Sequence, residues 1–311
     1  MNKKWLLVVL LSMLALMLTG CGGEKATSAE YFKYVVTPDD TVTITAYTGN
    51  EMKVVIPSKI NGKKVTGIDF NEGSSCGIMT SVVIPNTVTK ISDRAFQNCD
   101  LITSITIPSS VTRIGSMAFM NCDSLVEVTI PDGVTYIGDS AFRECNNLKR
   151  VTIADSVVHI GDSAFWCCES LAEVVLPKQV VYFGESVFGS TKLKEVVIPN
   201  GVTELHATFS KCYDLEKVTI PDGITVIGEG TFRYCRALKR IELPESVHTI
   251  GEDAFKDCSS LEYLNIPASV TQMGEVYDKS GTFANVDKSV IHVKAGSYAA
   301  EMFEGKGAVI E

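Results

Sequence analysis

One segment of about 23 residues recurs along most of the chain, and this repeat constrains the fold more than any other feature. The stretch 111–131 reads VTRIGSMAFMNCDSLVEVTIP, and close copies occupy 134–153 and 247–267. Self-similarity at a fixed period of this length is typical of solenoids, propellers and arrays. One position, where Ala154 once replaces proline, recurs every 22 or 23 residues as Pro85, Pro108, Pro131, Pro177, Pro199, Pro221, Pro244 and Pro267. The core aromatic position recurs in step as Phe96, Phe119, Phe142, Phe165, Phe188, Phe209, Phe232, Phe255 and Phe283.

Each repeat predicts one coil of a solenoid. In the copy 111–131, the segment that contains Leu125, Val128 and Ile130 alternates apolar and polar residues, which predicts a short strand that ends at Pro131. The pattern V-T-x-I-G predicts a second extended piece. The pattern A-F-x-x-C-x-x-L predicts a helical turn or less whose Phe, Cys and Leu point inward. One coil cannot bury its own apolar face, so the coils must stack, with a spacing of about 4.8 Å.

The pattern I-P-x-x-V-T-x-I-G-x-x-A-F-x-x-C-x-x-L-x-x-V, carried by residues 57–294, resembles the BspA-like leucine-rich repeat family of bacterial surface proteins. The resemblance implies a leucine-rich repeat solenoid that is mainly β with short helical turns. It would contain about ten stacked coils of 22–23 residues and be capped at both ends. The family also implies adhesion or recognition, with host or neighbouring-cell surface proteins or glycans as partners. Because function depends on sites placed on a fold, the resemblance is a weaker guide to function than to fold.

The chain divides into five segments. Residues 1–20 begin with Lys3 and Lys4, continue in an apolar run and predict an export signal. The run ends in Leu-Thr-Gly before Cys21, which resembles the bacterial lipobox and implies lipidation of Cys21 and an anchored, extracytoplasmic protein. The alternative is an ordinary secretory signal with a chance cysteine. The other segments are a lipidated tether at 21–30, a β-rich N-terminal cap at 31–56, the solenoid at 57–294 and a C-terminal cap at 295–311.

Eight of the ten cysteines occupy one position of the repeat, so stacked coils should place them in a ladder that faces the core. Parallel Cβ directions would keep their β-carbons near the coil spacing, which is longer than the ~3.8 Å of a disulfide. We therefore expect reduced, buried thiols that pack as small apolar side chains. A disulfide framework is the alternative in an exported chain, and a metal site is disfavoured because no column of histidines or carboxylates accompanies the ladder. The ladder comprises Cys76, Cys99, Cys122, Cys145, Cys168, Cys212, Cys235 and Cys258.

No set of side chains points to catalysis. The four histidines are His159, His206, His248 and His292. Four coils, or about 20 Å, separate His159 from His248, so they cannot share a metal ion. The sequence contains no phosphate loop and no calcium loop. We therefore expect no enzyme activity, no cofactor and no metal, with a surface hydrolase as the most remote alternative. The net charge of -9, without a basic cluster, argues against nucleic acid as a partner.

Two surface columns are candidates for ligand binding. The position before Ile in V-T-x-I is occupied by Tyr136, His159 and Tyr182 in three successive coils, so their rings should stack. Aromatic side chains with polar tips suit binding surfaces, although a ladder that only stabilises the sheet is the alternative. A broad repeating face also suits macromolecules, so the second candidate lies on the main sheet. It comprises Arg150, Glu173 and Glu195.

Two classes of function remain open at this point. The first is a lipid-anchored cell-surface module that binds proteins or glycans. The second is a structural or assembly component of the bacterium's own envelope. A pull-down against host matrix proteins, beside one against envelope extract from the same cells, would separate the two.

Overall fold

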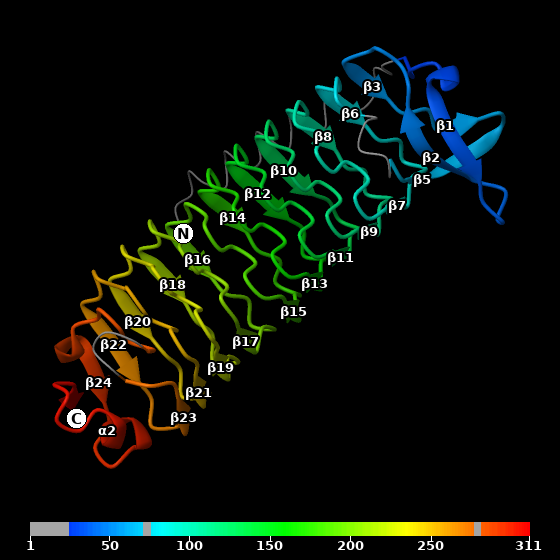
Figure 1. The fold of residues 1–311 in the computed structure, drawn as a ribbon. Helices are drawn as coiled ribbons and strands as arrows, with labels where there is room; N and C mark the ends of the chain where they lie inside the picture. Colours follow the sequence, from blue (N-terminus) through cyan, green and yellow to red (C-terminus); the bar gives the residue numbers. More distant parts are fainter. Residues whose placement is uncertain (1–24, 71–75, 277–280) are drawn as a thin grey trace, which may run out of the picture.

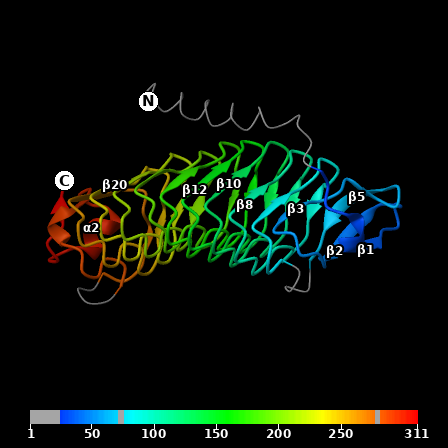
Figure 2. The same ribbon diagram turned by 90° about the horizontal axis from the view of Figure 1, so that it is seen from above.

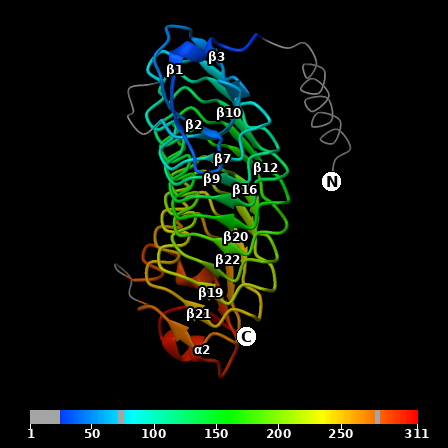
Figure 3. The same ribbon diagram turned by 90° about the vertical axis from the view of Figure 1, so that its right-hand side faces the viewer.

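The computed structural model describes residues 25–70, 76–276 and 281–311. The chain winds through about 11 turns of a β-solenoid with almost no helix (Figure 1). The stack is elongated, with its caps at opposite ends, as the views from above (Figure 2) and from the side (Figure 3) show. The predicted leucine-rich repeat solenoid is confirmed. The expected signal segment 1–20 and Cys21 lie outside the described residues.

One side of the coils forms a row of parallel strands that we term the wide sheet. In its strand β10, Val128 and Ile130 face the core, whereas Glu127 and Thr129 face solvent. This alternation follows from the period of two in a strand. The row comprises β3 (Lys53–Val55), β6 (Ser81–Val83), β8 (Ser104–Thr106), β10 (Glu127–Ile130), β12 (Arg150–Ile153), β14 (Glu173–Val175), β16 (Glu195–Val197), β18 (Lys217–Thr219), β20 (Arg240–Glu242), β22 (Tyr263–Ile266), β24 (Ile291–Val293) and β25 (Val309–Ile310).

A second side carries mostly two-residue strands, and we term it the narrow sheet. Each short strand turns its first residue outward and its second into the core, as Tyr136 and Ile137 do. The row comprises β2 (Val42–Tyr47), β5 (Lys63–Ile68), β7 (Lys90–Ile91), β9 (Arg113–Ile114), β11 (Tyr136–Ile137), β13 (His159–Ile160), β15 (Tyr182–Phe183), β17 (Glu204–Leu205), β19 (Val226–Ile227), β21 (Thr249–Ile250) and β23 (Gln272–Met273).

The third side consists of hydrogen-bonded turns in place of the helical turns that the A-F-x-x-C pattern suggested. Ser140 and Glu144 adopt left-handed conformations, with φ of 54° and 60°. The N–H of Phe119 donates to the carbonyl oxygen of Ala141 in the next coil, at 2.7 Å. Bonds between coils therefore take the place of bonds within a helix. The helical segments in the described residues are η1 (Ala29–Tyr31), η2 (Lys288–Val290) and α2 (Tyr298–Met302).

A spine of phenylalanine rings runs through the core. Consecutive rings are nearly parallel, with centroids between 5.0 and 6.2 Å apart. At the ends the contact becomes edge-on: Phe70 meets Phe96 at 84°, and Phe303 meets Phe283 at 61°. An edge-on ring does not offer its face to another coil, so these contacts end the stack. The stacked members are Phe96, Phe119, Phe142, Phe165, Phe188, Phe209, Phe232, Phe255 and Phe283.

Each end of the solenoid has its own cover. At the N-terminal end, β1 (Phe32–Val36) runs antiparallel to β2, and β4 (Lys59–Ile60) forms an antiparallel pair with β5. At the C-terminal end, β25 lies beside β24. The buried ammonium of Lys288 donates to the carbonyl oxygens of Phe283 and Val286, at 2.7 and 2.9 Å. Such covers keep the terminal coils from exposing core and sheet edges.

The wide sheet is unpaired between β8 and β10, and both sheets are interrupted together at a second place, which we term the seam. There β14 is not paired with β16, and β15 is not paired with β17. The chain is one residue shorter at two places around the seam, before and after a step of regular length from Leu193 to Leu205. The step from core Phe to core Leu takes six positions in Phe165–Leu171 but five in Phe188–Leu193. The step from strand to Phe takes five positions in Phe183–Phe188 but four in Leu205–Phe209. On the turn side the inter-coil hydrogen bonds continue across the seam.

Candidate functional site

The three aromatic residues proposed from the repeat form one continuous stack on the narrow sheet. Tyr136 is the register partner of His159, and His159 is the register partner of Tyr182. The ring centroids lie 4.2 Å apart in the first pair and 4.3 Å apart in the second, with planes within 10°. The guanidinium of Arg113 lies 3.7 Å from the centroid of Tyr136 and extends the stack by one coil. Sequence reasoning left Arg113 out, although it holds the same position of the repeat.

The stack is half-buried at its centre and exposed at one end. Burial lowers the pKa of His159, so its imidazole is neutral at pH 7. Tyr182 is 46% exposed, and its hydroxyl donates to Asp162 at 3.4 Å. Burial raises the pKa of Tyr182, and the carboxylates of Asp162, Asp139 and Glu185 raise it further. The exposed end of the stack therefore lies in a negative environment.

A groove of about 270 Å³ opens at the seam beside Tyr182. Residues 181–185 form one bank, and the other contains Glu204 and His206. His159 covers one face of the Tyr182 ring. The opposite face points along the column toward Glu204, which holds the same repeat position in the next coil. The Nε2 atom of His206 lies 3.2 Å from the Glu204 carboxylate.

The wide-sheet candidates form a charge ladder that is only partly continuous. Arg150 Nε donates to Glu173 at 2.7 Å, and its Nη1 donates to Glu127 at 3.2 Å. The hydrogen bond to Glu173 raises the pKa of Arg150. Glu195 lies across the seam from Glu173, and no ion pair of Glu195 occurs in the described part of the chain. The structure thus brings Arg150 and Glu173 together but leaves Glu195 apart. Exposed pairs of this kind typically stabilise by about 0–1 kcal/mol.

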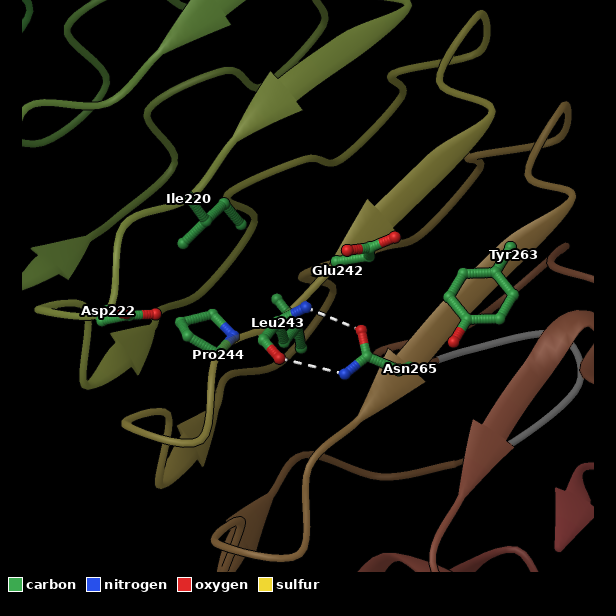
Figure 4. A pocket seen from close by; sticks show the side chains of 7 residues that line it. All are labelled: Ile220, Asp222, Glu242, Leu243, Pro244, Tyr263 and Asn265. Atoms are coloured by element: carbon green, nitrogen blue, oxygen red, sulfur yellow. Dashed lines mark hydrogen bonds between the residues drawn. The ribbon is translucent and has the colours of Figure 1, made fainter. Parts of the chain in front are cut away.

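A second hollow lies on the wide sheet at β18, β20 and β22 (Figure 4). The sequence repeat did not predict it. Its volume is about 380 Å³. The amide of Asn265 forms two hydrogen bonds with the backbone of Leu243, at 2.7 and 3.0 Å. The Arg240 guanidinium lies 3.9 Å from the Tyr263 centroid and donates to Glu242 at 2.6 Å. Arg240 and Tyr263 are partners in register, as Arg113 and Tyr136 are on the narrow sheet.

The eight ladder cysteines are buried, but the first two are not free. Cys76 and Cys99 form a disulfide, with their Cα atoms 5.3 Å apart. This corrects the expectation of reduced thiols for that pair. The argument from parallel Cβ directions assumes two regular coils, and Cys76 belongs to the longer first coil, which has Gly73 where the others carry Phe. The remaining ladder members are free thiols: Cys122, Cys145, Cys168, Cys212, Cys235 and Cys258.

A shared hydrogen bond fixes the free ladder thiols. Each donates from Sγ to the carbonyl oxygen of the Phe in the preceding coil, at 3.1–3.2 Å. At the seam the ladder position is held by Thr191, whose Oγ1 donates to the Phe188 carbonyl oxygen at 2.9 Å. Burial raises the pKa of Cys212 to about 11, which keeps this thiol protonated. These thiols are structural groups of the core.

The histidines do not come together. His159 lies in the aromatic stack and His206 at the seam, whereas Nδ1 of His292 lies 2.6 Å from Glu311. Within the described ranges, no three His, Cys, Asp or Glu side chains gather as metal ligands would. Nor does any helix in those ranges combine the length and apolar character needed to cross a membrane.

A family model described as BspA type leucine-rich repeat region, in six copies, matches residues 66–191 and 205–287. The two spans together make up more than half of the chain. The chain belongs to the BspA-type leucine-rich repeat family. The unmatched residues between the two spans, 192–204, coincide with the seam. The BspA-type repeat therefore continues on both sides of the seam and is irregular at it.

Solved structures of other bacterial repeat proteins are similar to this BspA-type chain. The leucine-rich repeat protein TpLRR of T. pallidum is 30% identical over 76% of this chain and 91% of its own, with a TM-score of 0.47. A leucine-rich cell surface protein of Faecalibacterium prausnitzii is 26% identical over 89% and 96%, with a TM-score of 0.38. The pneumococcal vaccine antigen PcpA is 18% identical over 90% and 96%, with a TM-score of 0.47. A comparison with curated proteins gives no match. The family is one of surface-type proteins, consistent with protein binding or adhesion.

Proposed function

We propose that this BspA-type chain is a lipid-anchored, extracytoplasmic surface module that binds proteins or glycans of a host or a neighbouring cell. The observation that carries the proposal is the stack from Arg113 to Tyr182 on the narrow sheet. The core positions repeat nearly unchanged from coil to coil, so they cannot distinguish one ligand from another. Specificity must come from outward positions that vary, and at this position three successive coils carry aromatic rings.

Exposed apolar and aromatic side chains adjoin each other at the open end of this stack. Val181 is 66% exposed, and its chain neighbour Tyr182 is 46% exposed. Exposed aromatic groups are enriched in binding surfaces. This exposure supports binding at the seam end of the stack over a purely stabilising ladder.

The triple alanine variant of Tyr136, His159 and Tyr182 tests the proposal. A binding screen with residues 30–311 against matrix proteins and glycans first supplies a partner. The variant should then keep its fold and lose at least about 1 kcal/mol of binding free energy, or roughly fivefold in affinity. The matched control is Arg150→Ala with Glu173→Ala on the wide sheet, which should bind as the unaltered chain does.

The reverse result would assign the function to the other surface. Unchanged affinity with a lowered melting temperature in the triple variant would show that the stack only stabilises the narrow sheet. Loss of affinity in the Arg150 and Glu173 variant would then place the ligand on the wide sheet.

The lipid anchor has a separate test. Cys21→Ala removes the thiol that would carry the lipid chains, each of which adds about 0.8 kcal/mol of membrane affinity per buried CH₂. The variant should either appear in the medium, outside the detergent phase, or remain as an uncleaved precursor of higher mass that keeps the apolar run 5–18. A variant that is cleaved and still partitions as the unaltered chain does would exclude lipidation at Cys21.

A further inference from the structure

At two places in the described residues, a guanidinium group lies within 4 Å of the centroid of a tyrosine ring in the following coil. Arg113 lies 3.7 Å from the centroid of Tyr136, and Arg240 lies 3.9 Å from the centroid of Tyr263. In both pairs the two residues are register partners in adjacent strands. The spacing between coils is therefore the spacing that a stacked guanidinium requires, and the cation gains from the negative face of the ring.

Tyr182 presents the same kind of ring face, and no guanidinium from the described ranges lies on it. His159 stacks on one side of it at 4.3 Å. On the other side the next coil offers a carboxylate, Glu204, at the equivalent position. Because β15 and β17 are not paired, the groove of about 270 Å³ opens between them. The outer face of the ring is thus left open to a group from outside the chain.

The walls of this groove carry negative charge. Glu185 and Glu204 line it, and no lysine or arginine is among the lining residues. Close by, Asp162 accepts hydrogen bonds from the Tyr182 hydroxyl and from the Glu185 N–H, at 3.4 and 2.9 Å. His206 faces Glu204 at 3.2 Å. An open aromatic face between carboxylates suits a flat cation.

We propose that the groove at the seam is a socket for an arginine side chain of a partner protein, stacked on Tyr182 and hydrogen-bonded to Glu204 and Glu185. This rests on the proposed function, because it specifies the chemistry that the aromatic stack recognises. The groove is smaller than the range of about 300–1,000 Å³ usual for small-molecule sites, so it accommodates a single side chain. Arginine fits better than lysine because its planar guanidinium both stacks on rings and donates to two carboxylates at once.

The test uses the full chain in detergent and short peptides as probes. Acetyl-Gly-Arg-Gly-amide is compared with the same peptide carrying citrulline, which keeps the shape of arginine and removes its charge. Ligand-observed NMR should show saturable binding of the arginine peptide, with a dissociation constant on the order of 1 mM. The citrulline peptide should bind at least fivefold more weakly. Diacetylchitobiose serves as a neutral glycan probe and should not bind.

Four variants locate the binding. Glu204→Gln should lower the affinity for the arginine peptide at least threefold, and Tyr182→Leu should abolish saturable binding of that peptide. Tyr182→Phe keeps the ring face and should retain binding. Glu262→Gln removes an exposed carboxylate away from the groove and should bind as the unaltered chain does. Because Glu204→Gln and Tyr182→Phe are conservative changes at exposed positions, thermal melting should confirm that both remain folded.

Three outcomes of the peptide experiments would overturn the socket. One is equal affinity for the arginine and citrulline peptides. Another is unchanged arginine binding in both Glu204→Gln and Tyr182→Leu. The third is saturable binding of diacetylchitobiose that Tyr182→Leu removes, which would assign the groove to glycans. A screened partner that is lost with the triple alanine variant but retained by Glu204→Gln would refute the socket while the proposed function stands. A partner that neither change affects would refute both.

Discussion

At the scale of single residues, the ladder position shows what sequence can and cannot predict. The repeat period places Cys145 in the core, and the structure has it there. The period does not show that the thiol of Cys145 donates a hydrogen bond to the carbonyl oxygen of Phe119. A buried carbonyl oxygen without a donor would lower the stability of the fold. Nor does the period show that Thr191, which holds the ladder position at the seam, donates to the carbonyl oxygen of Phe188 in its own coil, because the period fixes the position of a side chain and not its hydrogen-bond partner. The Cys76–Cys99 disulfide escaped prediction because it depends on the local backbone of an irregular coil.

His159 makes the stability of the stack depend on pH. Burial holds the pKa of His159 below its ordinary value of about 6.5, with Arg113 lowering it further and Asp139 and Asp162 opposing this. Between the folded pKa and about 6.5 the unfolded chain binds more protons than the folded chain, so stability falls as pH falls through this window. The melting temperature should therefore drop more between pH 7.5 and pH 5 in the unaltered chain than in His159→Gln. Parallel melting curves for the two proteins would contradict the prediction.

At the scale of the elements, the close approach of the coils after each narrow-sheet strand explains the recurrent glycine. A β-carbon at Gly161 would lie 2.4 Å from Asp139 Oδ1 and 2.6 Å from its backbone nitrogen. The glycine is thus required by the neighbouring coil, which a sequence pattern shows only as a turn. At the seam His206 stands in place of this glycine and its following acidic residue. The sequence shows the 22-residue step. It does not show whether the missing residue comes from a turn or from a strand, because the core residues stay in phase in either case.

Gly161→Ala should therefore destabilise the solenoid by about 1–3 kcal/mol, the usual cost of forcing an extra group into a packed site. The matched control is Gly77→Ala, where an added β-carbon would meet nothing within 4 Å. That variant should stay within about 0.5 kcal/mol of the unaltered chain. Denaturant unfolding of both variants measures the difference. A Gly161→Ala variant as stable as the control would show that the coils can separate at little cost.

At the scale of the whole molecule, each coil contacts mainly its neighbours, so stability should vary along the stack. The Cys76–Cys99 disulfide closes a loop of 23 residues and should contribute roughly 3 kcal/mol to the coils that it joins. In the double Cys→Ser variant, amide exchange should accelerate near Val82 and Ile91 and remain unchanged near Phe232. Equal acceleration at all three positions would mean that the solenoid opens as one cooperative unit.

The seam also determines how the body responds to mechanical load. Two of its three sides lack strand pairing there, and Phe188 and Phe209 have the widest ring separation in the spine, at 6.2 Å. The turn side stays joined by hydrogen bonds such as that from the Phe188 N–H to the Thr208 carbonyl oxygen, at 3.0 Å. The coils before the seam and the coils after it are thus connected mainly along one edge, the turn side. Bending away from that edge widens the groove at Tyr182, so a side chain that fills the groove should act as a wedge and set the angle of the joint.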